Sequence, residues 1–137
     1  MQSILERLQT GGPPLDILGL HGASTALLLS RAVEALQKTV CCILPSDEQL
    51  EILAQDIAFF SSVRVLVYPS FEIPPYTPLS PDPATVCTRL ATLYRLQDDQ
   101  SPCLVLTSAE AVLRRVLPAA ALNSRCELII ANEDTDR

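Results

Sequence analysis

Apolar residues recur along this chain in two alternating patterns, which are short continuous runs and longer segments with apolar positions at helical spacing. The continuous runs, which predict strands, cover residues 15–20, 40–44, 63–68, 103–107 and 128–131. The helical segments cover about residues 4–8, 23–38, 47–60, 84–96 and 109–116. Because parallel neighbours in a sheet need crossover connections, short strands that alternate with helices predict a parallel sheet. We therefore predict an open α/β fold with helices on both faces of the sheet, and burial of the run 40–44 on both of its faces.

One connection, residues 69–83, breaks this alternation and holds six of the eleven prolines. Proline fixes φ and biases the preceding residue towards extended conformations, so a stiff and ordered loop is predicted. Long loops in α/β domains are often functional, and Phe71 and Tyr76 would then anchor a contact surface. The alternative is a rigid crossover that covers the edge of the sheet. We favour this alternative because two aromatic residues are few for a base-stacking platform.

Composition narrows the class of protein. Of the 137 residues 48% are hydrophobic and 19% are charged, which excludes disorder as the main state. The formal net charge of −6 disfavours nucleic acid or an anionic membrane as a direct partner. No apolar run approaches the roughly 18 to 20 residues that span a bilayer, and the first ten residues do not have the pattern of a signal peptide. These features predict a soluble protein in the cytoplasm.

The five cysteines occur without a Cys-x-x-Cys spacing and without a neighbouring histidine. This pattern favours neither a disulfide framework nor a zinc site. We interpret the cysteines as reduced, small core residues of a cytosolic protein and predict no metal site.

All four glycines lie within the first 22 residues, and the turn from Gly19 falls where a phosphate-binding loop, Gly-x-x-x-x-Gly-Lys-[Ser/Thr], would join a strand to a helix. Ser24, Thr25 and Ala26 stand in place of the second glycine, the lysine and the hydroxyl residue. Thr25 has no positive charge to bridge the outer phosphates, and Ala26 cannot ligate a hydrated Mg²⁺ ion. We interpret Gly19, Gly22, Ser24, Thr25 and Ala26 as a vestigial phosphate loop, with no catalytic residue and no cofactor in this chain. Weak anion binding by the N–H groups of the following helix stays open.

Two adjoining segments resemble a known family. Residues 68–81 (YPSFEIPPYTPLSP) are similar to the pattern Pro-Asp-Trp-Glu-x-x-Pro-Tyr-Asp-x-x-Ser-Pro, and residues 88–96 (TRLATLYRL) to Ser-Arg-Leu-x-Thr-Leu-Tyr-x-Leu. Both patterns occur, in this order, in the amino-terminal part of the bacterial transcription-repair coupling factors (Mfd). The chain resembles that part over about residues 5–118, with shorter similarities at residues 19–23 and 105–116.

Three positions depart from the family pattern: Phe71 replaces tryptophan, Thr77 replaces aspartate, and Pro75 stands where an aliphatic residue is usual. For the fold, the resemblance implies a P-loop NTPase-like domain at residues 1–122, related to the first domain of UvrB and carrying a degenerate phosphate loop. For residues 123–137 it implies the truncated start of the following UvrA-binding domain, or a tail.

For function, the resemblance implies a scaffold in transcription-coupled nucleotide excision repair. In this family a neighbouring domain binds UvrA, and a separate carboxy-terminal motor uses ATP and Mg to displace stalled RNA polymerase on DNA. The expected partners are therefore UvrA, mainly through the adjacent domain, and other domains of the same polypeptide, with no membrane. RNA polymerase and DNA would be partners of the full-length protein. The alternative function is a small P-loop-type nucleotide-binding enzyme with an irregular phosphate loop, which Thr25 and Ala26 disfavour.

Four residues are candidates for an interaction surface of the scaffold. They are Phe71, Tyr76, Arg114 and Arg115. Arg114 and Arg115 could meet phosphate or an acidic partner, but adjacent residues on a helix point about 100° apart, so at least one of them is expected to be a plain solvated residue. We expect both arginines to be solvated.

Overall fold

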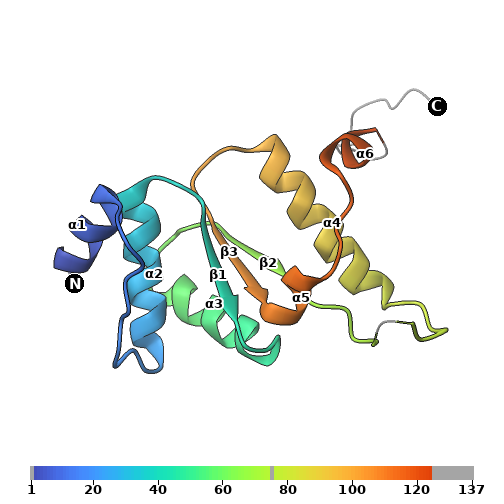
Figure 1. The fold of residues 1–137 in the computed structure, drawn as a ribbon, viewed down its shortest axis with the longest axis horizontal. Coiled ribbons are helices and arrows are strands. Elements are labelled where there is room, and N and C mark those ends of the chain that lie inside the picture. The colour runs from blue at the N-terminus through green and yellow to red at the C-terminus, as the bar shows by residue number, and fades with distance from the viewer. Residues whose placement is uncertain (1, 75, 125–137) are drawn as a thin grey trace.

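The computed structural model describes residues 2–74 and 76–124, and its centre is a parallel sheet of three strands (Figure 1). The strands are β1 (Val40–Leu44), β2 (Val65–Tyr68) and β3 (Leu104–Ser108). They lie in the order β1-β3-β2, and both pairs are parallel, so β3 is the central strand. The predicted α/β class with a parallel sheet is confirmed. The strand predicted at residues 128–131 lies outside the described residues.

Helices precede, connect and follow the strands in the described part of the chain. They are α1 (Gln2–Thr10), α2 (Ala23–Leu36), α3 (Glu48–Phe60), α4 (Pro83–Asp98), α5 (Ala109–Leu113) and α6 (Ala119–Asn123). The sequence signals explain the start of α4, where Asp82 accepts a hydrogen bond from the Thr85 N–H and Pro83 takes the first helical position. The five predicted helices are confirmed to within a few residues, while α6 was not predicted. No helix in the described part of the chain is long and apolar enough to cross a membrane.

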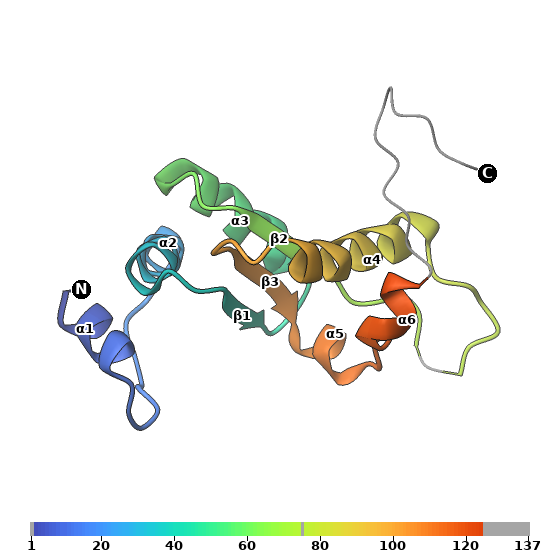
Figure 2. The same ribbon diagram turned by 90° about the horizontal axis from the view of Figure 1, so that it is seen from above.

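The side chains of β3 alternate between two cores, one on each face of the sheet. Leu104 and Leu106 pack with residues of α2 and α3, namely Ala26, Val33, Leu50, Leu53 and Ile57. Cys103 and Val105 pack on the other face with Leu66, Tyr68, Ala111, Leu93 and Leu96, which brings in α4 and α5. Figure 2 shows α3 and α5 on opposite sides of the sheet. Because both faces are covered, every residue of β3 is buried, and the prediction of helices on both faces is confirmed.

β1 differs from β3, and here the prediction of burial on both faces was wrong. Its side chains alternate between half-buried and exposed, with Cys41 exposed and Ile43 55% exposed. Val40 and Cys42 pack against the core formed by α2 and α3. β1 is an edge strand, and among the described residues no helix covers its second face. The apolar run alone could not show this difference from a central strand.

The edge of β2 that faces away from β3 is covered by α4. The Thr92 hydroxyl donates a hydrogen bond of 2.8 Å to the Val67 carbonyl, and Thr92 is itself buried. A covered carbonyl cannot serve as a template for an added strand. α4 therefore covers this part of the edge, and the edge-covering role that we favoured for the proline segment, residues 69–83, stays a prediction.

Residues 15–20 do not form the predicted strand. They pair with no strand in the described part of the chain, and the Leu18 side chain is 92% exposed. α1 packs against α2 and away from the sheet, so the chain between these helices runs beside α2 (Figure 1). An extended segment becomes a strand only where another strand offers its backbone groups, and no edge of the sheet does so here.

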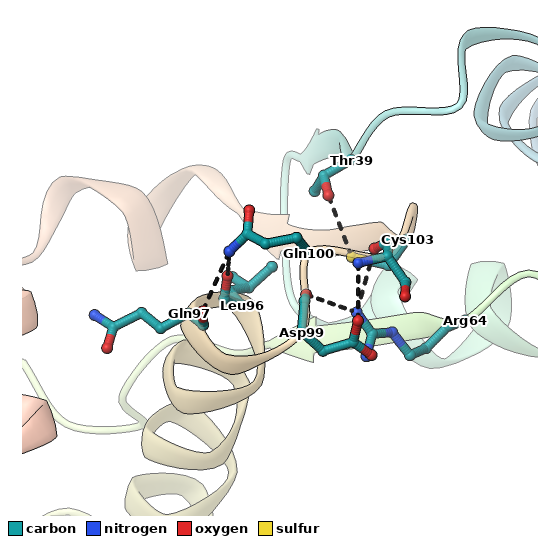
Figure 3. A network of polar contacts seen from close by, with 8 residues as sticks. Thr39, Arg64, Leu96, Gln97, Asp99, Gln100 and Cys103 are labelled. Atoms are coloured by element: carbon teal, nitrogen blue, oxygen red, sulfur yellow. Dashed lines mark hydrogen bonds and ion pairs between the residues drawn. The ribbon is translucent and has the colours of Figure 1, made fainter.

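The connection from α4 to β3 is fixed by one arginine (Figure 3). The Arg64 guanidinium contacts the Asp99 carboxylate and the carbonyls of Asp99 and Ser101. Asp99 also accepts a hydrogen bond of 2.8 Å from the Ser101 N–H. The hydrogen bonds from Ser101, followed by the charge of Arg64, lower the pKa of the Asp99 carboxyl. These contacts hold the start of β3 against the start of β2.

The cysteines do not all have the predicted role as small core residues. Cys103 is fully buried, but Cys41 and Cys87 are exposed and Cys42 is half-buried. Partial desolvation by neighbouring atoms raises the pKa of the Cys41 and Cys42 thiols although the Cys41 side chain is accessible, and this favours the unreactive thiol form. Within residues 2–74 and 76–124, no three His, Cys, Asp or Glu side chains are grouped as metal ligands.

Candidate functional site

The glycine turn, residues 19–26, closes on itself before α2. Gly22 has a φ of +53°. Across it, the His21 N–H donates a hydrogen bond of 2.9 Å to the Ser24 hydroxyl oxygen. The Ser24 hydroxyl donates back to the His21 carbonyl at 2.8 Å. The backbone N–H groups of Ser24 and Thr25 donate to the carbonyls of His21 and Gly22. Since a phosphate loop needs such N–H groups open to the ligand, this turn is poorly prepared to bind an anion.

A cavity of about 220 Å³ lies beside this turn, between the start of α2 and the outer side of α3. Its lining consists of Gly22, Thr25, Leu44, Gln49, Ile52, Leu53 and Asp56. The wall is thus largely aliphatic, with a single carboxylate and no cation. Ala26, at the position of the magnesium-binding hydroxyl, is fully buried in the core. A carboxylate in a partly apolar wall repels phosphate and favours an apolar or cationic group.

The proline segment is anchored to the domain by Arg89, which the sequence analysis did not single out. Arg89 is only 4% exposed, and its guanidinium carbon lies 4.0 Å from the centre of the Tyr68 ring and 4.2 Å from that of Phe71. It donates hydrogen bonds to the Pro69 carbonyl and, at 2.6 Å, to the Tyr68 hydroxyl. Burial lowers the pKa of Arg89 and raises that of Tyr68. The sequence did contain a sign that Arg89 is buried, because Arg89 lies one helical turn from Val86 on the apolar side of α4.

Arg114 follows the last residue of α5, has extended backbone angles and supports the same segment. Its guanidinium donates to the Ile73 carbonyl at 2.9 Å and to the Glu110 carboxylate at 3.0 Å, and lies 5.8 Å from the Phe71 ring. Its side chain is only 19% exposed, so the expectation of a solvated position was wrong for Arg114. Arg115 is exposed, and together with Phe71 and Arg89 it lines a cavity of about 200 Å³.

Asp47 ties the end of β1 to the proline segment. One oxygen of its carboxylate accepts hydrogen bonds from the Ser70 N–H at 2.7 Å and from the Ser70 hydroxyl at 2.8 Å. The other oxygen is buried without a hydrogen-bond partner among the described residues. Since β3 lies between β1 and β2, this contact spans the carboxyl end of the central strand.

Tyr76 lies in the same segment but points into solvent. Its ring is fully exposed and its φ is +67°, which is uncommon for a residue other than glycine. The structure therefore brings Phe71 and Arg114 together as supports of the proline segment and leaves Tyr76 and Arg115 accessible. An interaction through any of the four stays a prediction.

Comparisons with known proteins show which proteins this chain is similar to. No family model matches the chain. A protein of Myxococcus xanthus named transcription-repair-coupling factor is 36% identical over 127 residues, which cover 87% of this chain and 10% of that protein. The chain is related to the transcription-repair-coupling factors. Factors of the same name from Mycobacterium bovis and Mycobacterium tuberculosis are each 28% identical over 138 residues, covering 96% of this chain and 11% of theirs.

The chain thus spans about a tenth of the length of the transcription-repair-coupling factors that it matches. The shared part holds most of the chain. The resemblance seen in the sequence is confirmed at the level of a relationship to these factors. The activities of the remaining length of the relatives are not assigned to this chain.

Proposed function

We propose that this chain is a non-catalytic interaction module of a transcription-repair-coupling factor and acts in transcription-coupled nucleotide excision repair. The observation that carries the proposal is the cavity beside the glycine turn, which presents Asp56 and no cation where a nucleotide-binding loop would hold phosphate. The closed turn at Ser24 and Thr25 supports it, because their N–H groups already have acceptors. The finer fold assignment, a UvrB-like first domain with a degenerate phosphate loop, is part of this proposal.

In the proposed role the module supports recruitment of UvrA, mainly through an adjacent domain, and contacts other domains of its own polypeptide. ATP and Mg would act at a separate motor that displaces RNA polymerase on DNA, in the cytoplasm. The name and similarity of the relatives support this placement. The net charge of −6 agrees with a module that contacts proteins rather than DNA.

A thermal unfolding scan with and without millimolar Mg·ATP tests the loss of nucleotide binding. A ligand at 100 times its Kd adds about 2.7 kcal/mol to the stability of the folded state, which raises Tm by several degrees in a domain of this size. We expect no change in Tm. A rise that the double variant Gly19→Ala, Ser24→Ala abolishes would overturn the proposal and support the nucleotide-binding enzyme instead.

A further inference from the structure

The outer side of α3 is both acidic and apolar. The helix carries Glu48, Glu51 and Asp56 and no lysine or arginine. On the same helix Ile52 is 63% exposed and Phe59 is 85% exposed. These two residues are seven positions apart, so they lie on one side of α3, about 10 Å apart along its axis. Large apolar side chains that line up on an exposed helix mark an interaction site more often than isolated ones do.

The cavity beside the glycine turn continues this side of α3. Ile52 forms part of its wall together with Leu44 and Thr25, and Asp56 lies one helical turn beyond Ile52. The volume is about 220 Å³, whereas a cavity of roughly 150 Å³ accommodates benzene. The cavity can therefore hold one large apolar side chain. We call the cavity, Ile52, Asp56 and Phe59 together the α3 groove.

The carboxylates around the α3 groove have no partners in the structure. Among residues 2–74 and 76–124, the ion pairs involve Arg31, Arg64 and Arg114, and none of these pairs with an acidic residue of α3. Glu48, Glu51 and Asp56 also make no side-chain hydrogen bond in this part of the chain. The groove thus combines an apolar floor with uncompensated negative charge, which attracts a cation and repels phosphates and anionic lipid headgroups.

We propose that the α3 groove docks a basic amphipathic helix of a partner protein. One apolar side chain of that helix would enter the cavity against Ile52, and a second, two turns away, would pack on Phe59. A lysine or arginine between them would pair with Asp56, while Glu48 and Glu51 attract the partner during approach. This inference rests on the proposed function, because it requires that the cavity not hold a nucleotide.

Fluorescence anisotropy of a labelled helical peptide tests this docking. The probe has about 14 residues, with leucines at helical spacing and lysines elsewhere. We expect saturable binding, and much weaker binding of the peptide that has glutamate in place of every lysine. Equal binding of the two peptides, or no saturable binding up to about 1 mM, would overturn the inference.

Two matched pairs of variants place the binding in the α3 groove. Ile52→Ser should weaken the binding of the lysine peptide about tenfold and Asp56→Asn about fivefold, because one removes apolar contact and the other a charge. The controls are Leu113→Ser, which changes a side chain that is 86% exposed on α5, and Asp98→Asn at the end of α4. They should leave the affinity within about twofold. Equal losses in the groove and control variants would overturn the inference.

A competition experiment separates this inference from the proposed function. If Mg·ATP displaces the lysine peptide from the wild-type chain, at a concentration that leaves the anisotropy of the free peptide unchanged, the cavity binds nucleotide and the proposed function fails. If neither the peptide nor Mg·ATP binds, only the docking inference fails. All the variants change exposed or half-buried side chains, and a thermal scan of each checks that it is folded.

Discussion

The glycine turn before α2 and the proline segment after β2 are both irregular, but they are held in place differently. Hydrogen bonds in the turn join residues three positions apart, such as His21 and Ser24. The proline segment is held by Arg89, Asp47 and Arg114, whose partners lie 20, 23 and 41 positions away. The shape of the turn therefore depends on its own sequence, whereas that of the proline segment depends on the folded domain.

This difference bears on what each region can do. A turn that satisfies its own backbone groups has few donors left for a ligand. A segment tied to the ends of β1 and β2 and to α4 and α5 presents a fixed surface. Tyr76, with φ of +67°, is fully exposed on this surface.

The largest effect is expected for Arg89→Ala. This change removes a guanidinium that is stacked on Tyr68 and Phe71, and it leaves the buried Tyr68 hydroxyl and the Pro69 carbonyl without their donor. We expect the free energy of unfolding to fall by about 3 kcal/mol in a urea titration. Arg95→Ala, at an exposed position of the same helix, should cost less than about 0.5 kcal/mol. Similar losses for the two variants would mean that the stack does not hold the proline segment.

A smaller effect is expected for Asp47→Ala. The variant loses the acceptor of both Ser70 hydrogen bonds, and hydrogen bonds to a charged group contribute about 2 kcal/mol. Urea unfolding measures the loss, and hydrogen exchange of the Ser70 N–H should become faster. Asp47→Asn should lose less, because the amide oxygen still accepts from Ser70. Unchanged exchange at Ser70 in Asp47→Ala would show that the proline segment is fixed without this contact.

The sequence predicted best what depends on local pattern. The strands at residues 40–44, 63–68 and 103–107 are bounded by turn residues, and the cap at Asp82 marks the start of α4. The run 15–20 has the same apolar character but no strand edge beside it. Whether an apolar run pairs depends on distant parts of the chain, which a local pattern does not contain.

The candidate site likewise has one part that the sequence showed and one part that it did not. The sequence shows by itself that Thr25 and Ala26 depart from the phosphate-loop motif, because a motif fixes residue types at fixed spacing. The cavity with Asp56 was not visible, since it joins α2 to a helix that begins more than 20 positions later. Burial of Arg89 likewise needs two rings that precede it by 18 and 21 positions, and only their common place in the fold brings them together.

The smallest effect is expected in the glycine turn, for Ser24→Ala. The Ser24 hydroxyl accepts from the His21 N–H and donates to the His21 carbonyl, but both groups lie at the surface, where water replaces the lost partner. Alanine also has the higher helix propensity at this position in the first turn of α2, which offsets part of the loss. We expect the free energy of unfolding to change by less than about 0.5 kcal/mol in urea. A loss as large as that of Asp47→Ala would contradict the contrast, because it would mean that the turn, like the proline segment, is coupled to the rest of the domain.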